Sequence, residues 1–228
     1  LIKNKINHVA FILDGNKRWA KNAKLPKIQG YKKGFENIEN IVDHTLSLNI
    51  PNLTLFTLSS ENFNRPSINI IYEIIYKNFS KLINELVRKK NIKVNIFGSK
   101  KDVPQKILKI FEEVENTSKG NVLLNLNLAF NYGFKDEIKE VLKNYKKNYS
   151  SIDLNNYSEV RKLFYLGSIE DPDILIRTGG YKRLSNFIMF NLTYTELFFS
   201  DTLWPDFSIN EYSKIIDKYL KIDRKYGL

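Results

Sequence analysis

The chain has 228 residues, enough for a real hydrophobic core, and its 36 Lys and Arg residues outnumber 25 Asp and Glu, giving a formal net charge of +11. It has no cysteine, which excludes a disulfide framework and a thiolate metal site. No apolar run reaches the roughly 18 residues that a membrane-spanning helix requires. A basic chain can bind nucleic acid, an anionic membrane surface or a phosphorylated substrate. Without linkers or repeats, we expect one domain over residues 1–228.

Six short apolar runs have the length and residue types of β-strands, and segments with helical spacing separate most of them. The predicted strands are residues 8–13, 53–58, 92–98, 122–130, 173–177 and 197–200. The predicted helices are residues 34–48, 68–86, 104–118, 135–147 and 210–224, with Pro104 in the first turn of its helix. Strands that alternate with helices predict an α/β fold with a mostly parallel central sheet and helices on both faces.

Four of the predicted strands end in polar or charged residues. These ends are Asp14 to Trp19, Ser59 to Pro66, Asn131 to Gly133, and Arg177 to Gly180. Because ligands of open α/β sheets bind outside the carboxyl ends of the strands, we expect the four ends to meet at one crevice. The pattern favours an enzyme with a strongly anionic substrate.

Arginine is scarce in this chain, with seven residues, and its placement is informative. Arg18, Arg65, Arg177 and Arg183 all stand at or just beyond predicted strand ends. A planar guanidinium can bind phosphate oxygens in pairs, which an ammonium group cannot do. These positions therefore favour diphosphate binding more strongly than the net charge does.

Two of the motifs have an ordinary structural interpretation that the sequence leaves open. Gly15 would let the backbone approach a ligand, and Asp14 would bind Mg²⁺ together with diphosphate oxygens. An Asp-Gly turn in which Asp14 caps a helix explains the same residues. Ser59 and Asn62 could likewise cap the next helix, although capping needs only one such residue.

The third motif, Arg177 to Ser185, could hold a second diphosphate through Arg177, Arg183 and Ser185. Alternatively, Arg177 could leave its strand only to pair with Asp171 or Asp173. The sequence does not decide between these two interpretations.

Three further features allow more than one interpretation. The apolar stripe of residues 68–86 fits either a buried helix or one wall of an apolar channel. The aromatic segment 187–207, which contains Glu196, fits either hydrophobic core or an exposed subunit contact. His8 and His44 are far apart in the sequence, and we expect structural roles for both rather than a metal site.

Six sequence strings, taken together and in order, resemble the cis-prenyltransferases of the undecaprenyl and dehydrodolichyl diphosphate synthase type. The strings are HVAFILDGNKRWA, TLFTLSSENFNRP, LNLAFNYG, DPDILIRTGG, RLSNF and LWPDF, and they extend from His8 to Phe207. The resemblance implies a non-Rossmann α/β subunit with about six strands and an apolar tunnel, acting as a dimer. It implies a transferase that condenses isopentenyl diphosphate onto an allylic diphosphate such as farnesyl diphosphate. The expected product is a Z-polyprenyl diphosphate for polyprenol or dolichol carriers, and the expected cofactor is Mg²⁺.

The resemblance also implies roles for individual residues. Asp14 and Asn62 are the expected catalytic residues, and Asp14 and Glu196 are the expected metal-binding residues. The expected substrate-binding residues are Gly15, Asn16, Lys17, Arg18, Trp19, Lys27, Tyr31, Ser59, Ser60, Glu61, Phe63, Arg65, Arg177, Arg183, Leu184 and Ser185. Among these, Arg177, Arg183 and Ser185 correspond to the isopentenyl diphosphate pocket. Residues 68–86 correspond to the helix that lines the product tunnel, which favours the channel interpretation.

The sequence departs from the family pattern at several positions. Lys27 stands where bacterial members usually carry Arg, and Tyr31 stands where the family has His. Tyr181 and Lys182 replace the acidic residue that usually follows the Gly-Gly pair, and residues 224–228 match the family's C-terminal tail only in part. Lys27 keeps its charge without the guanidinium fork, so we expect an altered affinity for the allylic diphosphate.

Several expectations about partners and location follow from the resemblance. We expect a homodimer, with a heteromeric partner left open, no nucleic acid, and a cytoplasmic enzyme with peripheral contact at a membrane such as the endoplasmic reticulum; organelle targeting stays open. A non-catalytic partner subunit would share the fold but lack the aspartate and arginines that this chain retains. A nucleic-acid-binding domain would instead spread its basic residues along one face.

Overall fold

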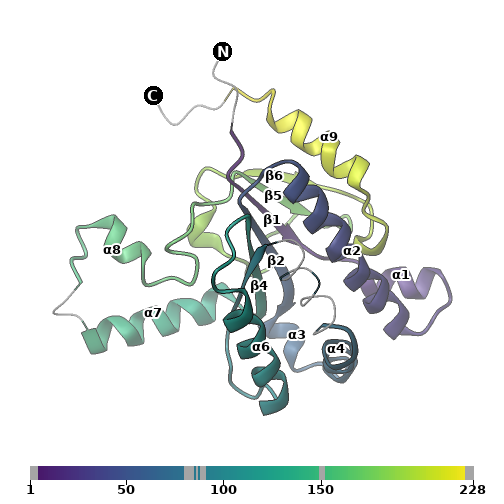
Figure 1. The fold of residues 1–228 in the computed structure, drawn as a ribbon, viewed down its shortest axis with the longest axis horizontal. Coiled ribbons are helices and arrows are strands. Elements are labelled where there is room, and N and C mark those ends of the chain that lie inside the picture. Colours follow the sequence, from purple (N-terminus) through teal and green to yellow (C-terminus); the bar gives the residue numbers. More distant parts are fainter. Residues whose placement is uncertain (1–4, 80–84, 86, 88–90, 149–151, 224–228) are drawn as a thin grey trace.

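The computed structural model describes residues 5–79, 85, 87, 91–148 and 152–223, and its centre is one six-stranded sheet (Figure 1). The strands are β1 (His8–Ile12), β2 (Asn52–Ser59), β3 (Ile92–Phe97), β4 (Leu124–Tyr132), β5 (Ile174–Arg177) and β6 (Glu196–Phe199). They lie in the order β3-β4-β2-β1-β5-β6, and every neighbouring pair is parallel. The α/β fold with a parallel sheet of six strands is therefore confirmed.

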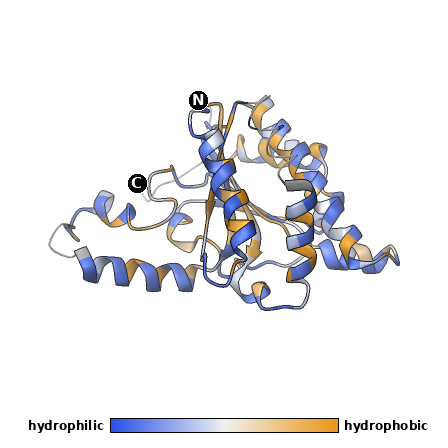
Figure 2. Ribbon diagram, turned by 60° about the horizontal axis from the view of Figure 1, so that its bottom comes forward, coloured by the Kyte–Doolittle hydropathy of each residue, from blue (hydrophilic) through white to orange (hydrophobic). Residues whose placement is uncertain are grey.

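Both faces of the sheet are covered, so its central strands are mostly buried, and polar side chains such as Thr54 and Asn127 find partners within the protein. In β1 all five residues are buried, and successive side chains point to opposite faces. Val9 and Phe11 belong to the larger hydrophobic cluster, whereas Ala10 and Ile12 belong to a second, smaller cluster. Figure 2 shows the hydrophobic residues concentrated on the strands and on the helix faces beside them.

The helices connect the parallel strands and cover the sheet. They are α1 (Asn16–Asn22), α2 (Lys27–Ser47), α3 (Ser60–Phe63), α4 (Ile68–Ile74), the π-helix η1 (Ile75–Phe79), α6 (Gln105–Ser118), α7 (Phe134–Asn148), α8 (Tyr157–Arg161), the 3₁₀-helices η3 (Met189–Asn191) and η4 (Trp204–Asp206), and α9 (Ile209–Tyr219). Helices α2, α6 and α9 supply buried residues to the larger cluster. In Figure 1, α7 and α8 extend away from the sheet, and Figure 2 shows that α7 is mostly hydrophilic.

The predicted strands are all present, with ends displaced by at most two residues. The helix expected at residues 34–48 begins earlier, at Lys27, directly after its N-cap residue Pro26. The sequence did not indicate these first turns, because their residues are mostly polar and form no apolar stripe. Pro104 also lies at an N-cap, just before the first turn in which it was expected. The last helix ends at Tyr219 rather than at residue 224, which is outside the described residues.

The segment after Pro66 forms α4 and continues as the π-helix η1. Most of the remaining predicted stripe, from residue 80 onward, lies outside the described residues. Among the residues that the structure describes, no helix is long and apolar enough to cross a membrane.

Candidate active site

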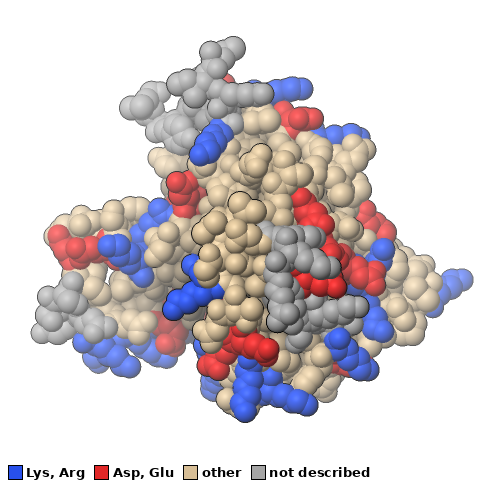
Figure 3. Space-filling model, in the orientation of Figure 1, with Lys and Arg blue, Asp and Glu red and all other residues tan. Residues whose placement is uncertain are grey.

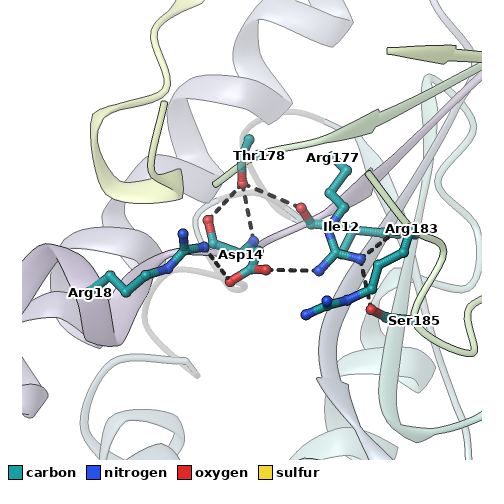
Figure 4. A network of polar contacts seen from close by, with 7 residues as sticks. All are labelled: Ile12, Asp14, Arg18, Arg177, Thr178, Arg183 and Ser185. Atoms are coloured by element: carbon teal, nitrogen blue, oxygen red, sulfur yellow. Dashed lines mark hydrogen bonds and ion pairs between the residues drawn. The ribbon is translucent and has the colours of Figure 1, made fainter. Parts of the chain in front are cut away.

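Asp14 follows the end of β1 and lies between two arginine side chains (Figure 4). Arg18 Nη2 is 3.0 Å from Asp14 Oδ1, and Arg177 Nη2 is 2.9 Å from Asp14 Oδ2. The Arg177 side chain is only 3% exposed, so its charge requires a close counter-ion, which Asp14 provides. The alternative pairing of Arg177 with Asp171 or Asp173 is therefore wrong.

The Asp14 backbone is held by Thr178, the residue after β5. Thr178 Oγ1 accepts a hydrogen bond from Asp14 N at 3.1 Å and donates one to Asp14 O at 2.9 Å. Trp204 N also donates to Asp14 O, at 3.0 Å. The loop that carries the Asp14 carboxylate is therefore fixed by two distant segments of the chain.

Gly15 permits a close approach, but of the chain to itself. Its φ is +131°, and a Cβ at this position would lie 2.9 Å from Leu203 Cα and from Trp204 N. Gly15 is the N-cap of α1 and no side chain caps this helix, so the interpretation of Asp14 as a helix cap is wrong. The first N–H groups of α1 have no partner within the helix and lie beside the pocket that Asp14 lines.

Arg177 also joins Asp14 to the loop that follows the Gly-Gly pair. Arg177 Nη1 donates to Ser185 Oγ at 2.7 Å and to the Arg183 carbonyl oxygen. Ser185 and Asn186 have φ values of +51° and +62°, and this turn directs the Ser185 hydroxyl toward Arg177. The structure therefore brings Arg177, Arg183 and Ser185 together, as the sequence predicts.

A polar pocket of about 260 Å³ opens beside Asp14. Its lining residues are Leu13, Asp14, Gly15, Asn16, Lys17, Arg18, Tyr31, Thr57, Leu58, Asn62, Arg65, Ser67 and Ile71. The pocket thus contains residues from the ends of both β1 and β2, together with their following helices.

The charges around this pocket are mainly positive. Partial burial lowers the pKa of the Lys17 ammonium group, and the nearby charges of Arg65 and Lys27 lower it further. Burial raises the pKa of the Tyr31 hydroxyl, while a hydrogen bond with Ser67 and the charge of Arg65 oppose this shift. Like charges gathered in a pocket indicate a site for an anion.

Two side-chain oxygens at the pocket lack a hydrogen-bond partner within the described part of the chain. They are Asn16 Oδ1 and Asn62 Oδ1, and both are buried. Buried polar atoms almost always have a partner, so the Asn62 oxygen is a candidate contact for a ligand, whereas Asn16 Oδ1 lies against Gly34. This is the environment expected for Asn62 if it contacts substrate.

The polar pocket adjoins an apolar cavity of about 100 Å³. The two share five lining residues, namely Leu13, Asn16, Tyr31, Thr57 and Ile71. The predicted stripe contributes Ile71, Ile74 and Ile75 to the cavity wall, and Phe111 and Phe130 also line the cavity. The described residues do not show a tunnel that continues beyond this cavity.

Several predicted substrate-binding residues have partners within the protein. Ser59 Oγ caps α3 by accepting from Asn62 N, so the capping interpretation holds for Ser59. Ser60 Oγ donates to Asp136 Oδ2 at 2.9 Å, and Glu61 accepts from Asn186 Nδ2 at 2.7 Å. These bonds connect the end of β2 to α7 and to the loop after β5.

Three other predicted residues lie at the margins of the site. Trp19 Nε1 donates to Asp206 Oδ1 at 2.7 Å, which links α1 to η4. Phe63 is buried beside Tyr72, and Leu184 packs against the smaller hydrophobic cluster.

The structure separates Glu196 from Asp14 within one chain. Glu196 pairs with Ile174 at the amino end of the strands, whereas Phe199 pairs with Arg177 at the carboxyl end. Three residues of extended strand span about 10 Å. The described subunit therefore does not bring the two predicted metal-binding carboxylates together.

The end of β4 adjoins the ends of β2 and β5, because Gly133 lies against Ser60 and Asn186, but its last side chains do not face Asp14. Asn131 Nδ2 donates to the Ser99 carbonyl oxygen, and the Tyr132 hydroxyl donates to buried Glu137. Together with Ser60 and Phe63 from the end of β2, Asn131 and Tyr132 line a second cleft of about 780 Å³. Their polar groups stabilise the loop after β3 and the start of α7 instead of facing Asp14.

The two histidines have structural hydrogen bonds, as expected. His8 is fully buried, and its ring contacts Thr54 Oγ1 and the Glu170 carbonyl oxygen. His44 Nε2 lies 2.8 Å from Ser213 Oγ.

Sequence reasoning missed the roles of Thr178 and Tyr181. Thr178 is fully buried against Asp14, and Tyr181 lies beneath three guanidinium groups. Both residues stand in the segment between Arg177 and Arg183, so their proximity to two arginines was the available signal.

Comparison with known proteins shows the family of the chain. The undecaprenyl diphosphate synthase family model (Prenyltransf) matches residues 12–227. The chain belongs to this family. An isoprenyl transferase from Thermotoga maritima is 39% identical over 226 residues, covering 96% of this chain and 96% of that protein. Another from Aquifex pyrophilus is 41% identical over 226 residues, covering 96% and 95%.

A solved structure supports the same relationship. The prenyltransferase resembles lavandulyl diphosphate synthase from Lavandula x intermedia, solved with dimethylallyl diphosphate, with a TM-score of 0.91 and 28% identity over 98% of each chain. The protein is thus a cis-prenyl chain-elongating transferase, and its substrates are isoprenoid diphosphates.

The prenyltransferase has few carboxylates at the site that could bind a metal ion. The described residues contain no group of three or more His, Cys, Asp or Glu side chains that could hold one. Asp14 provides one carboxylate at an anion pocket, which fits Mg²⁺, since this ion often takes one protein carboxylate and completes its shell with water and substrate phosphates.

Proposed function

We propose that the protein condenses isopentenyl diphosphate onto an allylic diphosphate, with farnesyl diphosphate as the expected starter, to make a Z-polyprenyl diphosphate for polyprenol or dolichol carriers. One observation carries the proposal: the cationic pocket beside Asp14 shares its wall with an apolar cavity. An allylic diphosphate has an anionic head and an apolar tail, and this pair of compartments matches it.

The head of the allylic substrate is assigned to the pocket that Lys17, Arg18 and Arg65 line. Lys27 adds charge from α2, because its electrostatic effect reaches Lys17. Isopentenyl diphosphate is assigned to Arg177, Arg183 and Ser185 on the other side of Asp14. In this proposal the two diphosphate groups lie on either side of a single carboxylate, so that the two reacting carbons can be held close together.

The reaction breaks the bond between the allylic carbon and its diphosphate oxygen, and forms a bond from that carbon to the terminal alkene carbon of isopentenyl diphosphate. Arg18 and Arg65 stabilise the negative charge that develops on the leaving diphosphate. Asp14 would hold Mg²⁺, which would supply further positive charge to the leaving diphosphate. One proton then leaves the new chain, and the unpartnered Asn62 Oδ1 or the released diphosphate assists its removal.

The apolar tail enters the cavity beside Tyr31 and Ile71. Burial of a hydrocarbon chain contributes about 0.8 kcal/mol for each CH₂ group, which favours movement of the growing chain away from water. The walls formed by Ile74, Ile75 and Phe111 would limit or redirect the chain as it lengthens.

A homodimer is part of the proposal. Strand β6 is the edge of the sheet, and its residues Leu197 and Phe199 are 44% and 37% exposed. Apolar side chains on an edge strand favour contact with a second copy of the chain.

Among the described residues, no specific observation favours a non-catalytic partner subunit or a nucleic-acid-binding domain. A non-catalytic subunit would not need Asp14 with its two arginine partners. On the face shown in Figure 3, Lys and Arg residues are separated by acidic and uncharged residues instead of forming a basic stripe. A nucleic-acid-binding surface requires such a stripe.

The test is incubation with radiolabelled isopentenyl diphosphate, farnesyl diphosphate and Mg²⁺, followed by separation of the products by chain length. The proposal predicts incorporation of label into products longer than the starter, and its loss when Mg²⁺ is chelated. Absence of incorporation with farnesyl diphosphate and with shorter and longer allylic starters would contradict it.

A further inference from the structure

The ring of Tyr181 lies beneath three arginine side chains. The guanidinium carbons of Arg18, Arg177 and Arg183 are 4.7, 5.8 and 4.3 Å from the ring centre. These arginines come from α1, from the end of β5 and from the loop that follows β5. One side chain therefore contacts cations from three segments at the candidate active site.

The backbone before Tyr181 makes this position possible. Gly179 and Gly180 have φ values of +84° and +82°, a conformation that favours glycine. A Cβ at Gly179 would lie 2.5 Å from Arg18 Nη2 and 2.8 Å from Asp14 O. The two glycines thus allow the chain to turn close to Asp14 and return with the aromatic ring against the arginines.

Arg18 and Arg177 share one carboxylate, Asp14, and Arg183 brings a third guanidinium to the same ring, which leaves an excess of positive charge at this place. Without a substrate these groups repel one another, and long arginine side chains lose substantial rotamer freedom when they are held in place. An aromatic ring attracts each guanidinium through its negatively polarised face. Tyr181 therefore reduces the cost of holding Arg18, Arg177 and Arg183 together.

The chemistry of the contact distinguishes a ring from an acidic residue. A guanidinium that stacks on a ring uses its flat face, and its N–H donors point outward from the edge. A carboxylate would instead bind those N–H donors and compete with a diphosphate for them. The family resemblance predicts an acidic residue after the Gly-Gly pair, and this chain has Tyr181 there instead. The arginines of this chain therefore contact an aromatic ring where a carboxylate was expected.

We propose that Tyr181 is a positioning residue that orders Arg177 and Arg183, together with Arg18, for the diphosphate of isopentenyl diphosphate without itself occupying their N–H donors. This inference rests on the proposed function and deepens it. Tyr181 acts through the arginines, and its effect is on binding of the second substrate.

The test compares Tyr181→Phe, Tyr181→Leu and Tyr181→Glu in steady-state turnover, with isopentenyl diphosphate varied and farnesyl diphosphate saturating. Tyr181→Leu is expected to raise KM for isopentenyl diphosphate by about tenfold or more, because it removes three cation–ring contacts. Tyr181→Phe keeps the ring face and is expected to stay within about threefold of the wild-type KM. Tyr181→Glu is expected to raise KM at least as much as Tyr181→Leu, with a smaller effect on kcat.

Tyr157→Leu is the matched control, because Tyr157 is 57% exposed against 44% for Tyr181 and stacks on Phe190 rather than on arginines. It is expected to leave KM unchanged. Equal KM values for the wild type and Tyr181→Leu would overturn the inference, as would a Tyr181→Phe defect as large as that of Tyr181→Leu. Thermal unfolding shows whether each variant is folded, and titration with inorganic pyrophosphate measures its affinity for the anion. A folded Tyr181→Leu protein with wild-type affinity for pyrophosphate would also overturn the inference. Failure of the proposed function itself would appear separately, as absence of turnover by the wild type.

Discussion

Arg177 Nη2 lies 2.9 Å from Asp14 Oδ2, and this ion pair joins the carboxyl ends of two neighbouring parallel strands. Arg177 is the last residue of β5, whereas Asp14 follows β1. The guanidinium is almost fully buried and the carboxylate is 28% exposed. Asp14 therefore has a structural partner on its buried side and still faces the pocket, so its role in the fold and its role in the chemistry must be measured separately.

Substitution of Asp14 with alanine is expected to abolish turnover, and denaturant unfolding of the variant measures separately the stability lost when buried Arg177 loses its counter-ion. The change removes the carboxylate that would bind Mg²⁺ and leaves Arg18 and Arg177 without their shared counter-ion. We expect a loss of at least about 100-fold in kcat, measured by incorporation of labelled isopentenyl diphosphate.

The matched control for this prediction is Asp171→Ala. Asp171 accepts from Arg161 Nη2 at 2.9 Å, the same distance as in the Asp14–Arg177 pair, but it lies outside the pocket. Its turnover should stay near the wild-type value. Unchanged activity of Asp14→Ala would remove this residue from the reaction.

Thr178 is predicted to affect turnover through its hydroxyl. Thr178→Val keeps the shape of the side chain but removes the bonds to Asp14 N and Asp14 O. We expect kcat to fall by about 30-fold, since one net hydrogen bond contributes roughly 1 kcal/mol, the Asp14 loop loses two, and each 1.4 kcal/mol is a factor of about ten. Thr178→Ser keeps the hydroxyl and should retain most of the activity; a defect equal to that of Thr178→Val would show that the methyl group matters instead.

Gly15→Ala is expected to destabilise the protein by about 1–3 kcal/mol in the free energy of unfolding, measured by denaturant titration. The reason is double: φ at this position is +131°, and a Cβ would meet the Leu203 and Trp204 backbone at 2.9 Å. Gly120→Ala is the control, because a Cβ there has no heavy atom within 4 Å. Equal stabilities of the two variants would contradict the prediction.

The sheet was predictable because its central strands are continuous apolar runs, such as residues 8–13, that end in clear polar clusters. The grouping of Asp14, Arg177 and Ser185 was also predictable, since the carboxyl ends of neighbouring parallel strands meet at one edge. The sequence could not reveal that the Tyr132 side chain turns away from Asp14, because Tyr132 finds its partner in Glu137 through the packing of α7.

The role of Gly15 was also only partly predictable. A glycine after a strand indicates a close approach, but the partner in that approach comes from Leu203, about 190 residues away in the sequence. The stack of Tyr181 on three arginines depends in the same way on long-range folding, which local motifs do not encode.

Acid is expected to weaken the fold through His8. Burial lowers the pKa of this imidazole from 6.5 to about 4, and the nearby charges of Asp173 and Arg161 shift it in opposite directions. Between these two pH values the unfolded chain binds a proton that the folded chain does not, so stability falls as pH decreases from about 6.5 toward 4. The free energy of unfolding should drop by about 2–3 kcal/mol from this residue between about pH 7 and pH 4.5.

The measurement is denaturant unfolding of the wild type and of His8→Asn at both pH values. The variant should lose stability at neutral pH but show a smaller decrease on acidification. His44→Asn is the comparison: partial burial lowers the pKa of His44 as well, and its replacement should change the pH dependence less than replacement of fully buried His8. A pH dependence that is identical in the wild type and in His8→Asn would contradict the assignment.

Product length is expected to depend on Phe111, which lines the apolar cavity and packs edge-to-face on Phe130 at a ring separation of 5.1 Å. Phe111→Ala enlarges a cavity of about 100 Å³, so a growing hydrocarbon chain should extend further before it meets the wall. We expect longer products in chain-length analysis, with a loss of stability of about 3–5 kcal/mol.

Phe164→Ala is the matched control: Phe164 is 7% exposed against 8% for Phe111, but it stacks on Phe190 away from the cavity. A similar loss of stability in both variants, with longer products only from Phe111→Ala, would separate the shape of the cavity from general loosening of the fold. Unchanged product length in Phe111→Ala would contradict the prediction, because it would mean that Phe111 does not limit the growing hydrocarbon chain.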